Sequence, residues 1–156
     1  MDALKLHILV NYYPAIGMVL ATIALIAGLW LRNVGLTRSV LKLLVLLSLL
    51  TLVVAFSGEF ASWSADWYTG ARKEALASHK ISGTVAFAAT MLTGIAAVIA
   101  LVRGRDLPEK GRWAVVATLL LAVVASAVLV LTIFKGRQIK WAGTAAVVTV
   151  AAEVRS

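Results

Sequence analysis

Four long apolar runs dominate the chain, and each is apolar all round rather than along one stripe. Residues 8–31, 81–102 and 113–134 contain no Asp, Glu, Lys or Arg, and a shorter run occupies residues 43–58. A membrane-spanning helix needs about 20 consecutive apolar residues, and Lys42 can extend the short run by keeping its ammonium group at the interface. The pattern therefore predicts four transmembrane helices, over about residues 8–32, 39–60, 79–103 and 113–135.

Short connections predict how these helices are arranged. Residues 32–38, which include Gly35, join the first two spans, and residues 106–109 join the last two. Helices joined by only a few residues pack as antiparallel neighbours. We therefore expect an all-α fold, an integral membrane four-helix bundle with up-down-up-down topology.

Two segments lie outside the predicted spans. Residues 59–78 mix charged residues with Trp63 and Trp67, as is typical of a lipid headgroup layer. After the last span, the apolar run of residues 141–152 is too short to cross the bilayer again. We expect residues 1–135 to form the bundle and residues 136–156 to form an interfacial C-terminal tail.

The first span contains Pro14, directly after the aromatic pair Tyr12 and Tyr13. Proline is best tolerated in the first turn of a helix, and aromatic side chains favour the membrane interface. The regular helix is therefore expected to begin near Pro14, with residues 7–11 as an irregular or kinked start. His7 would then lie at the depth of the membrane surface.

Small side chains predict which faces of the spans pack together. Inside lipid, close backbone approach takes over the role of the hydrophobic effect in holding helices together. The expected inward faces are Gly17, Ala21, Ala24 and Gly28; Ser48, Thr51 and Ala55; Ala86, Thr90 and Gly94; and Ala114, Thr118, Ala122 and Ser126.

The charge pattern suggests an orientation. The net charge is +8, but the cations lie at helix ends rather than in a basic stripe, so lipid headgroups are expected partners and nucleic acid is not. The loops after the first and third spans hold Arg32, Arg38, Lys42, Arg103, Arg105, Lys110 and Arg112. By the positive-inside rule these loops are cytoplasmic, which places both termini at the outer face.

The candidate chemistry gathers at that outer face. The chain has two histidines, His7 before the first span and His79 at the start of the third, and the topology brings both to one side of the membrane. His79 shares a helical face with Gly83 and is expected to point inward, with the glycine leaving room for a flat group. Glu59 ends the second span in line with Thr51 and is expected at the same face.

Three interpretations of this face remain open. Two histidines from different helices can be the axial ligands of haem b, whose chemistry is one-electron transfer. His7, His79 and Glu59 together can instead hold a single transition-metal ion. Alternatively the histidines only meet headgroups, and the protein is a cofactor-free accessory subunit.

Other chemistries find no support in the sequence. The chain has no cysteine, which excludes thiolate metal sites, iron–sulfur clusters and thioether-linked haem. It also shows no nucleophile with a base partner, no glycine-rich phosphate loop and no acidic residue within a span. We therefore expect an electron carrier or accessory subunit without independent catalytic activity.

Several residues together resemble a bacterial four-helix membrane family described only as domain of unknown function 2231. The features are His7 followed by Val10 to Ala15 (VNYYPA), Gly58 with Glu59, His79 opening the third span, and the tail glycines Gly136 and Gly143. Members commonly carry further histidines where this chain has Asn11 or Tyr12, and Ala142. The resemblance implies the four-helix fold and a bacterial inner membrane, with periplasmic termini in the orientation given above, and leaves His7 and His79 as ligands.

The leading hypothesis is a b-type haem electron-transfer protein or a cytochrome-like subunit of a larger membrane complex. His7 and His79 would be its axial ligands. Its expected partners are the lipid bilayer and other membrane subunits.

Overall fold

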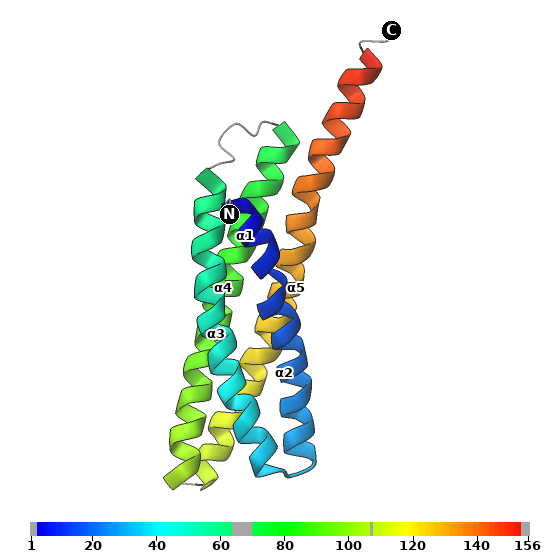
Figure 1. The fold of residues 1–156 in the computed structure, drawn as a ribbon. Coiled ribbons are helices and arrows are strands. Elements are labelled where there is room, and N and C mark those ends of the chain that lie inside the picture. Colours follow the sequence, from blue (N-terminus) through cyan, green and yellow to red (C-terminus); the bar gives the residue numbers. More distant parts are fainter. Residues whose placement is uncertain (1–2, 64–69, 107, 154–156) are drawn as a thin grey trace.

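The computed structural model describes the backbone of residues 3–63, 70–106 and 108–153, and the side chains of residues 7–63, 70–104 and 111–139. These residues form five helices and no strand (Figure 1): α1 Ala3–Val10, α2 Tyr12–Trp30, α3 Val34–Trp63, α4 Gly70–Asp106 and α5 Pro108–Glu153. The prediction of an all-α fold is confirmed. The centre of the predicted headgroup segment, including Trp67, lies outside the described residues.

Helices α2 to α5 run alternately up and down in one bundle (Figure 1). Each packs against the next along the chain, and α2 also packs against α5, so the four helices close into a ring. The short helix α1 packs mainly on α3. The predicted up-down-up-down topology is therefore confirmed, and α1 is an additional element at one end of the bundle.

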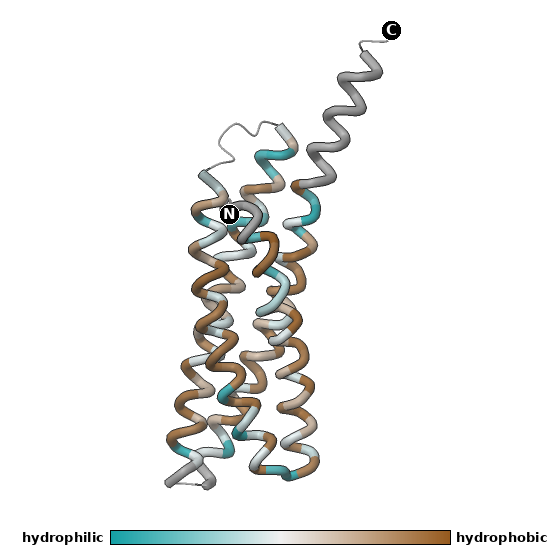
Figure 2. The backbone as a smooth tube through the Cα atoms, viewed as in Figure 1, coloured by the Kyte–Doolittle hydropathy of each residue, from teal (hydrophilic) through white to brown (hydrophobic). Residues whose placement is uncertain are grey.

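The length and composition of four segments allow them to cross a membrane. They are His7–Trp30, Val34–Trp63, Gly70–Gly104 and Gly111–Ile139. Apolar residues follow these segments along most of their length (Figure 2), and large side chains such as Leu20, Leu46 and Leu120 face outward. Exposed leucine is favourable only where the surroundings are also apolar, so the protein is a multi-pass membrane protein in a lipid environment.

The start of the first span is helical, contrary to part of the prediction. Residues 7–10 belong to the regular helix α1, and the Asn11 N–H still donates to the His7 carbonyl at 3.0 Å. The interruption at Asn11 has the predicted cause, because Pro14 has no N–H to donate to the carbonyl of Val10. The chain therefore bends between α1 and α2 (Figure 1), and its helical structure begins before Pro14.

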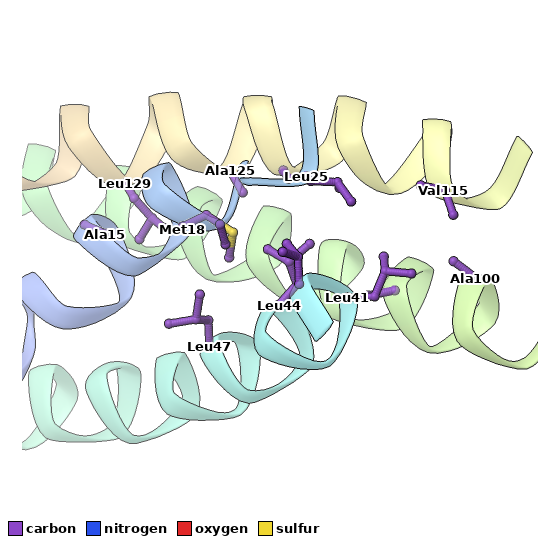
Figure 3. Packing of buried hydrophobic residues seen from close by; sticks show 14 of the residues in the cluster. Ala15, Met18, Leu25, Leu41, Leu44, Leu47, Ala100, Val115, Ala125 and Leu129 are labelled. Atoms are coloured by element: carbon purple, nitrogen blue, oxygen red, sulfur yellow. The ribbon is translucent and has the colours of Figure 1, made fainter. Parts of the chain in front are cut away.

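The small-residue faces of three spans lie inside the bundle, as predicted. Ala21, Ala86, Thr90, Thr118 and Ala122 are all buried. Larger apolar side chains fill the space between these faces, and Figure 3 shows the cluster that they form. Among its labelled members are Met18, Leu25, Leu41, Leu44 and Leu129.

The prediction for the second span is wrong at its C-terminal end. Ser48 and Thr51 are buried, but Ala55 and Glu59 are exposed, and Ser57 and Ala61 face inward instead. A four-residue step advances about 40° beyond a full turn, so the row from Thr51 to Glu59 rotates away from the interior. Because α1 packs on α3, the buried face near this end is the one that contacts α1.

The C-terminal segment continues α5. Residues 136–153 are helical without a break from Pro108, and this part extends beyond the ends of the other helices (Figure 1). Helix α5 therefore crosses the boundary that separates the predicted bundle from the predicted tail. The location of this segment at the membrane interface stays a prediction.

Close contacts at small residues hold the helices together. A Cβ atom added at Gly94 of α4 would overlap the Ser48 Oγ of α3 and would lie 2.7 Å from its Cβ. The Thr22 hydroxyl of α2 donates to the Met18 carbonyl at 2.8 Å. The Thr22 Oγ1 also lies 3.1 Å from the Ser126 Oγ of α5, so a hydrogen bond joins the two helices. Buried threonines donate similarly to their own helices, for example Thr90 to the Ala86 carbonyl.

We expect Gly94→Ala to destabilise the bundle by about 1–3 kcal/mol, because the new methyl group must displace Ser48. The check is the free energy of unfolding in mixed detergent micelles. Gly83→Ala is the matched control on the same helix, since its Cβ would meet only the Thr132 Cγ2 at 4.0 Å. Adding Ser48→Gly to Gly94→Ala should restore stability, and equal stability of the two alanine variants would contradict the expectation.

Candidate functional site, a histidine pair at one end of the bundle

Helices α1 and α4 bring the two histidines of the chain together. The ring centroids of His7 and His79 lie 6.4 Å apart, and the ring planes are inclined at 76°. Both side chains are half-buried. The prediction that both histidines reach the same end of the bundle is confirmed, and the fold makes them neighbours.

The hydrogen bond of His79 fixes which of its nitrogens carries a proton. Its Nδ1 lies 3.0 Å from the Thr132 carbonyl oxygen on α5. A carbonyl can only accept, so Nδ1 is the protonated nitrogen of the neutral ring. The lone pair on Nε2 is then available to a ligand, in the arrangement that metal-binding histidines usually adopt.

The hydrogen bond of His7 leads to the same protonation pattern. Its Nδ1 lies 3.2 Å from the Ser57 Oγ on α3. The single hydroxyl proton of Ser57 is donated to the Val54 carbonyl at 2.9 Å. With that proton on Val54, the Ser57 oxygen accepts from the His7 Nδ1, and the Val54 backbone carbonyl is a further hydrogen-bond partner of the ring. This arrangement places the His7 proton on Nδ1 and a lone pair on Nε2.

Each imidazole ring rests on a glycine of a neighbouring helix. A Cβ atom at Gly58 of α3 would lie 2.9 Å from the His7 Cε1, and one at Gly136 of α5 would lie 3.1 Å from the His79 Cε1. These distances are too short for a methyl group and a ring to coexist without movement. Both glycines therefore allow the rings to lie directly against helix backbone.

These supporting residues were not assigned by the sequence analysis. Gly58 and Gly136 contribute to the family resemblance, but neither Ser57 nor Thr132 is marked by any motif. A glycine within a helix costs about 0.5–1 kcal/mol relative to alanine. Interior helical glycines at the same end as the histidines are therefore the signal that points to these contacts.

Of two other predicted features of the site, one lies beside the histidines and one does not. Gly83 is half-buried and faces Thr132 of α5, whose carbonyl also binds His79. Glu59 pairs with Lys80 at 3.4 Å, and the two side chains are 55% and 47% exposed. Among the residues with described side chains, no three His, Asp or Glu gather closely enough to hold a metal ion.

The two rings form an edge-to-face contact, with centres 6.4 Å apart. This contact brings two imidazole donors from different helices to one place at this end of the bundle. Two neutral imidazoles are also the donor set that haem iron accepts at its axial positions.

No family model, curated protein or solved structure matches the chain. The family resemblance drawn from the sequence stays a prediction.

We expect ¹⁵N NMR of histidine-labelled protein to show both rings neutral with the proton on Nδ1. In Ser57→Ala, His7 loses one hydrogen-bond partner and keeps the Val54 backbone carbonyl, so its ring ¹⁵N shifts should change while Nδ1 stays protonated, and the His79 signals should stay unchanged. Ser62→Ala is the control, because the Ser62 hydroxyl on the same helix contacts Lys80 and neither histidine. A His7 signal that responds equally to both substitutions would contradict the assigned hydrogen bond.

Proposed function

We propose that this protein is a membrane-embedded b-type haem protein that transfers single electrons, with His7 and His79 as axial ligands. The observation that carries the proposal is the pair of neighbouring rings, each with Nδ1 bonded to the protein and a lone pair on Nε2. Because the chain has no cysteine, the haem would be held without covalent attachment.

The donor set favours haem over a bare metal ion. The porphyrin supplies four ligands, so its iron needs only two from the protein. A zinc ion needs at least three protein ligands, and Glu59 is directed to Lys80 instead. The described part of the chain offers two suitable side chains at this end, which is the number that haem requires.

Bound haem would supply reversible one-electron chemistry. The residues of this chain would hold and orient its ligands. The Thr132 carbonyl and the Ser57 hydroxyl keep the proton on Nδ1 and limit rotation of the rings, and Gly58 and Gly136 leave room for the rings beside the helices. A hydrogen bond to the far nitrogen also makes imidazole a better donor at Nε2.

The proposed orientation in a bacterial inner membrane places the histidine pair and both termini on the periplasmic side. Among the described side chains, the end formed by the α2–α3 and α4–α5 connections carries five cations and no carboxylate: Arg32, Arg38, Lys42, Arg103 and Arg112. The histidine end also carries five cations, Arg72, Lys73, Lys80, Lys135 and Arg137, but they are accompanied by Glu59 and Glu74. The net charge is therefore more positive at the connection end, which favours contact of that end with the anionic cytoplasmic leaflet.

The small size of the bundle favours a role within a larger membrane complex. The periplasmic position of the histidine pair would expose it to redox partners at that surface. Lipid and other membrane subunits are the proposed partners, and nucleic acid is not among them.

Protein purified from haem-sufficient cells should show a reduced-minus-oxidised difference band of b type. His7→Ala and His79→Ala should each abolish the band, because each removes one axial ligand. Glu59→Gln is the matched control at the same end and should leave the band unchanged. Thermal unfolding of each variant shows whether the fold is retained.

A colourless wild-type protein would overturn the proposal. If that protein held one metal ion per chain and lost it in Glu59→Gln, the site would be a non-haem metal site. If it held neither haem nor metal, the histidine pair would be structural and the protein an accessory subunit.

Gly58→Ala should lower haem affinity by about 10–100-fold, as loss of a supporting contact commonly does, because the methyl group must move the His7 ring. Affinity is measured by titrating the apoprotein with haemin in detergent. Gly104→Ala, at the opposite end of the bundle, is the control, since its methyl group would meet no atom within 4 Å. Unchanged affinity in Gly58→Ala would show that the position of the ring does not matter for binding.

A further inference from the structure

A groove lies between α4 and α5 near the end of the bundle opposite the histidine pair. It has a volume of about 290 Å³ and is lined by Ala96, Ile99, Arg103, Trp113, Ala114 and Ala117. None of these residues belongs to the histidine site.

The walls of the groove are apolar and open to the outside of the bundle. Three alanines from the two helices leave a shallow channel between them, and Ile99 and Ala117 are exposed. The groove therefore faces the surrounding lipid and suits a narrow hydrocarbon chain.

The mouth of the groove is cationic and lies at headgroup depth. Trp113 is 76% exposed, and tryptophan favours the membrane interface. Arg103 lines the groove and makes no hydrogen bond or ion pair with the described residues. Arg112 adds a second exposed cation near the start of α5, so the described side chains give the mouth of the groove a positive charge.

We propose that this groove binds an anionic glycerophospholipid of the adjoining leaflet. One acyl chain lies between α4 and α5 against the alanines and Ile99, and the Arg103 guanidinium donates hydrogen bonds to the phosphate. Arginine suits this role because its planar fork matches two phosphate oxygens. An uncharged membrane molecule offers Arg103 no opposite charge, and a partner helix would have to bury the charge of Arg103.

The proposal does not depend on haem binding. Its test is native mass spectrometry of the full-length protein in detergent, titrated with dioleoylphosphatidylglycerol or dioleoylphosphatidylcholine. We expect the wild-type protein to bind the anionic lipid about tenfold more tightly, as one charge-assisted contact can provide. Arg103→Gln should abolish this preference.

Ala117→Leu tests the apolar part of the groove. Ala117 faces outward, so leucine is tolerated there, but its larger side chain fills the channel. This substitution should weaken binding of both lipids several-fold, whereas Arg103→Gln should weaken binding of the anionic lipid more than that of the zwitterionic lipid, whose choline already balances its phosphate charge.

Arg38→Gln is the matched control, because Arg38 is an exposed arginine at the same end that does not line the groove. It should retain the preference for the anionic lipid. Equal binding of the two lipids by the wild-type protein would overturn the proposal. So would equal losses in Arg38→Gln and Arg103→Gln, because the attraction would then be a property of the whole cationic surface.

Discussion

Close approach of helix backbones is the constraint on which the rest of this structure depends. Lipid is as apolar as leucine, so helices inside a bilayer gain little by hiding leucine from it and associate where small residues allow intimate contact. Gly94 of α4 meets Ser48 of α3 in this way, and Gly17 of α2 meets Leu47 of α3. Gly58 and Gly136 also allow a close contact because they have no side chain, but there the contacting groups are the imidazole rings of His7 and His79.

The cost of an unpaired polar group in a low-dielectric interior explains the chemistry of the site. The buried hydroxyls of Thr90, Thr118 and Thr132 donate to carbonyls one turn earlier, so they bring no free donor into the bundle. The histidines obey the same rule at Nδ1, where Ser57 and the Thr132 carbonyl accept their protons. The Nε2 atom of each histidine keeps its lone pair. The histidines therefore differ from the interior threonines in having a nitrogen that can bind a ligand.

The two ends of the bundle differ in ways that suit different ligands. At the histidine end, two imidazole rings meet where α1, α3, α4 and α5 pack together. At the other end, Arg103 lines an apolar groove, and the described side chains there include cations but no carboxylate. The proposed haem and the proposed lipid would therefore occupy opposite faces of the membrane, with the closely packed core between them.

The sequence by itself determined the four spans, their antiparallel order, the inward faces of three helices and the meeting of His7 and His79 at one end. These features depend on local properties, namely the length of apolar runs, short connections and residue size. The tertiary structure decided the regular helix α1, the outward position of Glu59, the 6.4 Å separation of the rings and the acceptors of their protons. Each of these depends on how far one helix is rotated about its axis against its neighbours, and a rotation of tens of degrees leaves no trace in the pattern of apolar residues.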